Sequence, residues 1–399
     1  MIILREQLFW EYLGVAEALA VSTFVLLGLL LRLRDTDPPR MHIWSMIAFF
    51  SVNICDCLDS LVYSDIFIGP SALYRWNDVL IPGYIVALYF YVRALTSPTP
   101  KLARADLVHL LPFVAGFLCL SPALILPGDI RIGLVDGAIS DRRQDVIETG
   151  ETIFWIVWVA ILMVYGTICI RRLILHKRNI RDVFSDLEGK TLRWLDALVA
   201  TIFTIAFIVI ADEIGQLLGY NSLREGIWSL LFDVILPMSF GIFALRANPP
   251  LPGWSGSVLK EEAAPKEDPI TEPGPSTSRY ARSGLTQQDI ERYAMRLEKR
   301  MAEGQLWRDH NLNLRGLATL ISIPPIHLSE VLNTKVGMSF YDYVNQCRIR
   351  DACELLIQTN ESILEISETV GFNAKSTFNT RFKKVTDQTP TQWRATHKP

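Results

Sequence analysis

Long apolar segments separated by short polar stretches fill the first 245 residues of the chain. Each has few charges and a length of about 20 residues, which a helix needs to cross the roughly 30 Å hydrocarbon core of a bilayer. There are seven of them, at residues 12–31, 41–62, 73–95, 107–126, 152–173, 192–218 and 226–245. The pattern therefore predicts a seven-helix transmembrane bundle in residues 1–246.

Basic residues predict the orientation of this bundle. The loops after the first, third and fifth segments hold most of the Lys and Arg, among them Arg32, Arg93 and Arg171. Loops of this kind stay in the cytoplasm. We therefore expect the N-terminus outside and, after an odd number of spans, everything beyond Arg246 in the cytoplasm.

Acidic residues lie inside the predicted spans, in their outer halves. A charge at such a depth costs roughly 2.5 to 3.5 kcal/mol, so it tends to face the bundle interior or a hydrated cavity. One interpretation is an outward-facing, ligand-sensing pocket for a cationic ligand, a metal ion or protons. The alternative is that these groups satisfy one another, or a partner such as Arg75, as interhelical hydrogen bonds. The acids are Glu17, Asp56, Asp59, Asp78, Asp212, Glu213 and Asp233.

The second part of the chain has a different composition. Residues 247–284 are rich in Pro, Glu, Ser and Thr, cannot bury a core, and are predicted to be a flexible cytoplasmic linker. Helical spacing of apolar residues then predicts a helix at 287–303 and a helix-turn-helix at 314–321 and 325–335. A further helix at 341–358 would join this motif to a second one.

The second helix-turn-helix is the most informative stretch. An apolar stripe ends at Gly371, a natural helix terminator, and the next helix buries Phe378 and Phe382, four residues apart. From Gly371 to the end, six Lys and Arg residues face a single acid, Asp387. The net charge of −3 for the whole chain averages two unlike halves and does not argue against a DNA partner. On charge alone, a solvated helical hairpin in a helical bundle is the alternative to a DNA-binding motif.

The string GFNAKSTFNTRFKKVTDQTPTQWR closely resembles the second helix-turn-helix of AraC/XylS-type transcription regulators. It has the Gly-Phe turn, the Ser-x-Phe-x-x-x-Phe-Lys core and the Thr-Pro-x-x-x-Arg ending, and the resemblance covers residues 285–399. Ser322 and Asp387 depart from it, because the family usually has Gly there. Pro324 replaces the usual Ser or Thr N-cap of the first reader.

The resemblance implies two recognition helices that read successive segments of the major groove. We expect the first reader to contribute less affinity, because Glu330 is repelled by phosphate. The base-facing set that it implies is Ile326, Ser329 and Glu330 in the first reader, and Lys375, Ser376, Asn379 and Thr380 in the second. Its phosphate contacts are Arg381, Lys383 and Lys384.

Together these patterns predict an all-α, membrane-embedded one-component transcription regulator of the bacterial inner membrane. Residues 1–246 would sense an extracytoplasmic or membrane signal, and an AraC-like domain at 285–399 would bind promoter DNA. The expected partners are promoter DNA and the lipid bilayer. Further candidates are RNA polymerase, a second copy of the chain and an unidentified inducer, for which a cation is one candidate. The signal would act by changing how copies pair, or by proteolytic release at the linker.

The sequence does not predict an enzyme. The six cysteines lack the paired spacing of a zinc site, and no phosphate loop, catalytic triad or cofactor motif is found in the sequence. We therefore expect no catalytic residues, no metal and no cofactor. The alternative function is a cation transporter or membrane receptor whose helical tail is a regulatory interaction module.

Overall fold

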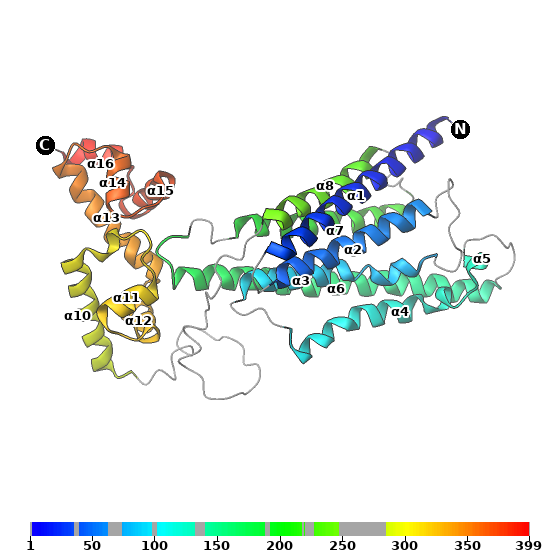
Figure 1. Cartoon of the computed structure of the whole chain (residues 1–399), viewed down its shortest axis with the longest axis horizontal. Coiled ribbons are helices and arrows are strands. Elements are labelled where there is room, and N and C mark those ends of the chain that lie inside the picture. Colours follow the sequence, from blue (N-terminus) through cyan, green and yellow to red (C-terminus); the bar gives the residue numbers. More distant parts are fainter. Residues whose placement is uncertain are drawn as a thin grey trace. The chain divides into compact units, whose positions relative to one another are not determined.

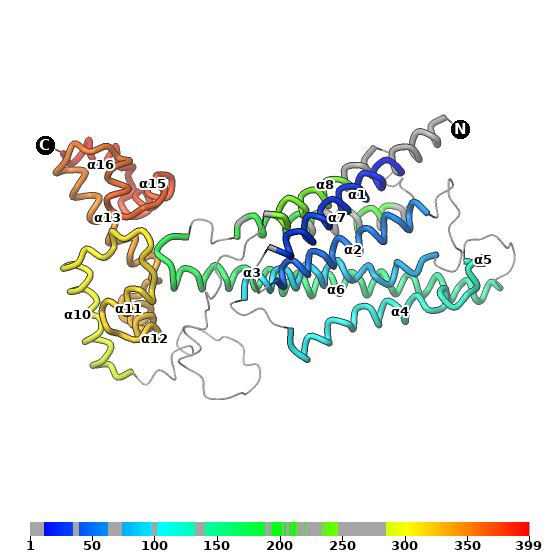
Figure 2. The backbone as a smooth tube through the Cα atoms, viewed as in Figure 1, coloured from blue at the N-terminus to red at the C-terminus, as the bar shows by residue number. Residues whose placement is uncertain are grey.

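The computed structural model describes residues 2–35, 40–62, 74–97, 102–131, 140–187, 192–217, 219, 227–246 and 285–398. Within these ranges the chain is helical, with one isolated β-bridge in place of a sheet. It divides into two compact units (Figure 1; Figure 2). The first unit comprises Met1–Ile174 and Leu192–Gly253, and the second comprises Leu175–Thr191 and Trp254–Pro399.

The first unit is a bundle of long helices. Figure 1 shows them running side by side, with α1 next to α8 and α2. In chain order they are α1 (Ile2–Asp35), α2 (Met41–Val62), η2 (Trp76–Leu80), α3 (Gly83–Thr96), η3 (Arg104–Leu110), α4 (Leu111–Leu124), α5 (Gly128–Arg131), α6 (Asp141–Arg181), α7 (Arg193–Leu217) and α8 (Ile227–Arg246). The end of α6, from Leu175, belongs to the second unit.

Five stretches of this bundle are long and apolar enough to cross a membrane, among the residues that the structure describes: Tyr12–Arg34, Met41–Val62, Trp76–Thr96, Arg104–Leu124 and Asp141–Arg181. They correspond to the first five predicted segments. The last two predicted segments are helical as α7 and α8, but both are only partly described, so the count of seven spans stays a prediction. Large apolar side chains point outward, for example Phe24, which is 72% exposed, and Ile156, which is 64% exposed. A bundle that faces lipid needs such an exterior.

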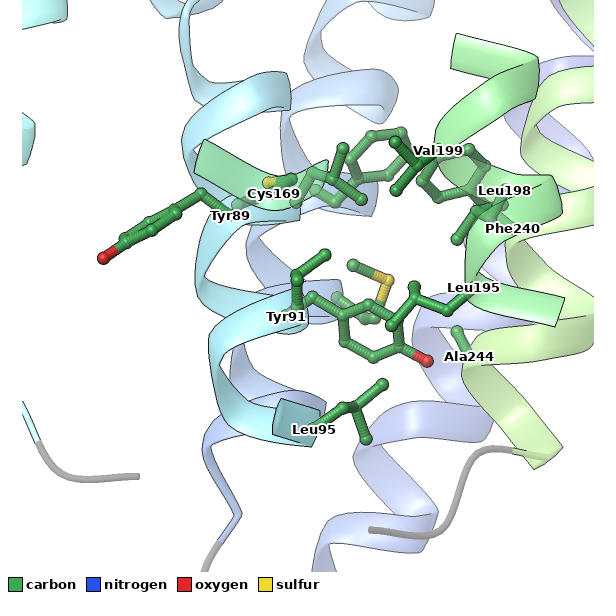
Figure 3. Packing of buried hydrophobic residues seen from close by; sticks show 14 of the residues in the cluster. Tyr89, Tyr91, Leu95, Cys169, Leu195, Leu198, Val199, Phe240 and Ala244 are labelled. Carbon is green, nitrogen blue, oxygen red and sulfur yellow. The ribbon is translucent and has the colours of Figure 1, made fainter. Parts of the chain in front are cut away.

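The core of the bundle forms around α3. Figure 3 shows Tyr91 and Leu95 of α3 near Leu195 of α7 and Ala244 of α8. Phe240 of α8 lies parallel to Phe49 of α2, with ring centroids 4.6 Å apart.

Several predicted spans have different boundaries in the structure. The segment at 12–31 lies within α1, which starts at Ile2, and the segment at 107–126 is divided between η3 and α4. The segment at 73–95 is interrupted at Pro82, where η2 gives way to α3. The segment at 152–173 is only the middle of α6, which has 41 residues. Its charged ends are rich in good helix formers and contain no proline, so the helix continues beyond the apolar stretch at both ends.

The second unit contains the described part of the C-terminal domain. Its elements are α10 (Gln287–Gly304), η4 (Leu306–Arg308), α11 (Leu314–Ile321), α12 (Pro325–Val331), η5 (Leu332–Val336), α13 (Phe340–Gln358), α14 (Ile363–Thr369), α15 (Lys375–Thr386) and α16 (Pro390–His397). These confirm the helices predicted for both helix-turn-helix motifs and for the connection between them. The predicted linker at 247–284 lies outside the described residues.

Two small cores stabilise this domain, one for each helix-turn-helix. The first contains Leu317 and Leu328. The second contains Ile366 and several aromatic residues, among them Phe378. Helix α13 supplies side chains to both, because its buried residues run from Val344 in the first core to Leu356 in the second. It therefore connects the two readers, as the sequence predicted.

Candidate nucleic-acid interface

Helix α15 is fixed by two aromatic anchors. Phe378 and Phe382 are fully buried, and their ring centroids lie 5.6 Å apart. Phe378 also contacts Phe372, which follows the turn, at 5.4 Å. Because these anchors occupy one face of the helix, the opposite face is turned to solvent.

The outer face of α15 is polar and positively charged. We call its six exposed polar residues the α15 face; Val385 is exposed near the end of the helix, and the helix contains no acidic residue. Lysine and amide side chains on one helical face have the chemistry to contact phosphates and base edges in a major groove. Six of the seven positions predicted for the second reader are thus exposed together: Lys375, Ser376, Asn379, Thr380, Lys383 and Lys384.

Arg381 is the exception on this helix. Its guanidinium donates to the Asp342 carboxylate over 3.2 Å and to the Tyr341 hydroxyl over 3.2 Å, and it lies 4.3 Å from the Tyr341 ring centroid. Burial would raise the pKa of Asp342, but Ser339 and the arginines Arg181 and Arg381 outweigh it, so the pKa is lowered. Arg381 therefore binds the connecting helix in this arrangement, instead of facing solvent as a phosphate contact would.

The turn before α15 depends on Gly371. Its φ is +93°, a conformation that favours glycine, and an added Cβ would lie 2.6 Å from the carbonyl oxygen of Arg308 and 2.8 Å from that of Trp307. Helix α14 begins with a capping box, in which Ser362 and Glu365 satisfy each other's backbone N–H groups. The second reader is therefore fixed at its turn and at the start of α14.

The first reader presents its second helix differently. Ile326 is half-buried, Ser329 is 1% exposed and Glu330 is 6% exposed. Ser329 and Glu330 thus do not lie on an exposed face of α12, contrary to the expectation for base contacts. Pro324 starts this helix without a side-chain cap, and Ser322 adopts the left-handed conformation at its turn, with φ of 55°.

A buried polar joint connects the two readers, and the sequence reasoning missed it. Arg348 of α13 is 1% exposed and donates to the carbonyl oxygens of Trp307 and Asp309 over 2.7 and 2.8 Å. Burial lowers the pKa of Arg348 to about 10. Asp351, one turn later, accepts from the Trp307 indole over 2.7 Å and from Arg308 over 2.8 Å. The sequence does contain a signal for this joint: Arg348 falls on the apolar face of α13, in line with Val344 and Leu356.

Part of the acidic set in the first unit also comes together. Asp56 accepts hydrogen bonds from Asn77 over 2.9 Å and from Tyr84 over 3.2 Å. Arg75 bridges Asp78, at 3.1 Å, and Glu151, at 2.5 Å. A cavity of about 370 Å³ is lined by Asp59, Arg75, Asp78 and Glu151, with Trp155 and other apolar residues beside them. Glu151, just outside the predicted fifth span, was not predicted.

Two of the remaining predicted acids have described side chains. Glu17 is exposed on α1, and Asp212 is buried on α7. The side chains of Glu213 and Asp233 lie outside the described residues. Within the described part of the chain, no group of three or more His, Cys, Asp or Glu residues has the arrangement to hold a metal ion.

Comparison with known proteins shows what the C-terminal region is similar to. A family model described as a helix-turn-helix domain matches residues 317–396. The bifunctional transcriptional activator/DNA repair enzyme AdaA of Bacillus subtilis is 36% identical over 83 residues, which are 21% of this chain and 39% of AdaA. The regulator GlxA of Rhizobium meliloti is 34% identical over 79 residues, 20% of this chain and 24% of GlxA. The chain therefore spans well under half the length of either relative.

One solved structure is also similar to part of this chain. The C-terminal domain of AraT, a response regulator from Geobacillus stearothermophilus, is 28% identical and covers 29% of this chain and 90% of that domain, with a TM-score of 0.24. The chain thus carries an AraC-type helix-turn-helix domain at its C-terminal end, similar to those of transcriptional regulators. The match to the family model does not extend into the first 245 residues.

Proposed function

We propose that this protein is a membrane-embedded, one-component transcription regulator. In this proposal residues 1–246 cross the bilayer seven times, residues 247–284 form a cytoplasmic linker, and residues 285–399 bind promoter DNA. The observation that carries it is the α15 face, a basic and polar surface on an AraC-type domain, in the same chain as long helices with an apolar exterior.

Base reading would rest mainly on the second reader. Asn379 has an amide that can bond to adenine, and Lys375 at the first turn can reach a guanine or a phosphate. Lys383 and Lys384 would bind phosphates. Because Ser329 and Glu330 are buried, we leave them out of the proposed base-facing set and keep Ile326 as an apolar contact.

The cavity near Asp59 is where we propose that a signal acts. Three carboxylates and one guanidinium line it, so a cationic ligand or a proton would be favoured there. A promoter fusion tests this: external pH steps and a panel of inorganic cations should change its output, and Asp59→Asn with Asp78→Asn should abolish the response. Glu17→Gln, exposed on α1, is the matched control. A response that survives the double substitution removes this cavity from the proposal.

Genome-wide DNA occupancy tests the function itself. Full-length protein should give discrete peaks that share a sequence motif, and a variant with Lys375, Asn379 and Lys383 all changed to Ala should lose them. Gln288, Lys299 and Arg300 of α10, changed together to Ala, remove similar groups from another exposed helix and should leave the peaks in place. Peaks that are equally strong in the α15 variant would contradict the proposal.

A further inference from the structure

Residues 181–187, which begin with the last residue of α6, pack on the DNA-binding domain, and we call them the docking segment. The stretch Leu175–Thr191 belongs to the same compact unit as that domain. Phe184 and Asn313 form an isolated antiparallel bridge, flanked by two backbone hydrogen bonds of 2.9 and 3.4 Å. The bridge attaches the docking segment to the residue that caps α11 in the first reader.

Ser185 contacts the joint between the two readers. It is 1% exposed, and its carbonyl oxygen accepts from Asn345 over 3.3 Å and from Arg348 over 3.4 Å. The second terminal nitrogen of Arg348 donates to the Ser185 hydroxyl over 3.3 Å. A buried guanidinium needs an acceptor for each of its N–H groups. Ser185 therefore supplies acceptors that the joint uses when the docking segment is in place.

Charged contacts extend the docking segment to the second reader. Arg181 donates to the Asp342 carboxylate over 2.7 and 3.1 Å, and the same carboxylate accepts from Arg381 of α15. Asp186 accepts from the Asn373 amide over 2.7 Å. Asn373 is exposed and lies two residues before α15 begins. The docking segment thus contacts the first reader, the connecting helix and the approach to the second recognition helix.

These contacts have a direct consequence for DNA. A recognition helix enters the major groove with its N-terminal residues near the bases and with phosphates on either side. The carboxylate of Asp186 lies beside that end of α15, where it would repel phosphates. Docking also adds contacts to the joint that holds the two readers in one arrangement.

We propose that the docking segment is an intramolecular brake on DNA binding, and that displacement of α6 withdraws it from the domain. This inference rests on the proposed function and deepens it. Helix α6 is among those long and apolar enough to cross a membrane, and the docking segment continues from it directly. A signal would therefore reach the DNA-binding domain through α6, independently of the linker at 247–284.

A cysteine pair across the bridge tests the docking in the full-length protein in lipid vesicles. Phe184 and Asn313 form a non-hydrogen-bonded pair, whose Cα atoms are about 4.5 Å apart in such bridges, within the range of a disulfide. With Phe184→Cys and Asn313→Cys together, mild oxidation should form a cross-link that neither single variant forms. The oxidised protein should then bind a labelled duplex, carrying the most occupied genomic site, about five- to tenfold more weakly than the same sample after reduction.

Loss of the docking contacts should have the opposite effect. Arg181→Ala with Asp186→Asn should bind the same duplex about five- to tenfold more tightly than the unaltered protein. Arg178→Ala, which removes an exposed arginine one turn earlier on α6, should leave the affinity unchanged.

The possible failures can be told apart. If no cross-link forms, the docking itself is wrong. If oxidised and reduced forms bind equally, and both bind far better than the α15 triple variant, the brake is wrong but the regulator stands. If no form binds better than the triple variant, the proposed function fails and the brake fails with it.

Discussion

The two helix-turn-helix readers of this domain share an architecture but present different surfaces. In the second reader, buried aromatic anchors turn Lys375, Asn379 and Lys383 outward. In the first, the corresponding short helix buries Ser329 and Glu330. The same motif therefore gives a basic, exposed face in one case and a mainly structural element in the other. The capacity to read DNA depends on which side chains the packing leaves outside, and the helix-turn-helix alone does not determine it.

The readers also differ at their turns. Gly371 has a φ of +93° and sits against the backbone of Trp307 and Arg308. Ser322 reaches the left-handed region with a φ of 55° and is exposed. The turn of the second reader is thus part of the joint between the readers, whereas that of the first faces solvent. This contrast predicts very different tolerance to substitution.

Gly371→Ala should have the largest effect. A left-handed conformation costs a non-glycine residue about 1 to 2 kcal/mol, and the clash of the added methyl group with two carbonyl oxygens adds about 1 to 3 kcal/mol. We expect the free energy of unfolding of the C-terminal domain to fall by about 3 kcal/mol or more. Pulse proteolysis of that domain in detergent-solubilised full-length protein measures it.

Gly337 is the matched control for that change. It also has a positive φ, of +74°, but an added Cβ would meet no atom within 4 Å. Gly337→Ala should therefore cost only the conformational part, about 1 kcal/mol. Equal losses at both glycines would show that the contact with Trp307 and Arg308 is unimportant.

Asp351→Asn should weaken the joint between the readers by about 2 kcal/mol, because hydrogen bonds to a charged group typically contribute about 1.5 to 3 kcal/mol. Burial would raise the pKa of Asp351, but hydrogen bonds from Arg308 and Trp307 outweigh it, so the pKa is lowered. The folded form then binds the proton less well than the unfolded form. Its contribution is complete above a pH of about 4 and is lost as the pH falls through the lowered pKa.

The measurement is the free energy of unfolding of the domain as a function of pH. The unaltered protein should lose stability below a pH of about 4, and Asp351→Asn should lose less over the same interval. Glu354→Gln is the control, because Glu354 is exposed and lies one helical turn after Asp351 on α13. An identical acid-side slope in the Asp351 variant would contradict the assignment.

Substitutions on the recognition helices should separate reading from packing. Asn379→Ala should cost about 1 to 3 kcal/mol at one base pair and relax specificity there. Lys383→Ala should weaken binding to all sequences and reduce the salt dependence by about one phosphate contact. Glu330→Gln in the first reader should alter the stability of the domain without changing sequence preference, because the side chain is buried. Binding titrations on single-base variants of an occupied site distinguish these three outcomes.

Much of the domain could be predicted because its signals are local. Helical spacing and Gly371 gave both helix-turn-helix motifs, and the positions of Phe378 and Phe382 gave the exposed side of α15. The burial of Ser329 and Glu330 could not be read in this way, since it depends on tertiary packing around α12. The Ser-x-x-Glu pattern of Ser362 and Glu365 is a further local signal, because it is typical of the capping box that starts α14.

The membrane-like half shows the same limit. Apolar runs predicted helices correctly, but they could not give the full length of α6, because charged helix formers extend it past the apolar stretch. The contacts of Ser185 and Asp186 with the DNA-binding domain join residues more than 120 positions apart, and no local pattern reports such pairs. Likewise, the sequence offered Arg75 as a partner for the acids but gave no reason to include Glu151.

Glycine in place of Ser322 or Asp387, two of the non-glycine residues with a positive φ, should have the smallest effect and the most specific one. Ser322→Gly relieves a left-handed serine, so we expect a gain of about 0.5 kcal/mol after the entropic cost of glycine. Asp387, with φ of 58°, should gain less on changing to Gly, because aspartate tolerates this conformation better. Asp387→Gly also removes the one acid beside the basic end of the second reader, so it should raise DNA affinity at low salt, and Ser322→Gly should not. Asp387→Asn separates the two effects, since it should give the affinity gain without the gain in stability; if it gives neither, the charge at this turn does not act on DNA.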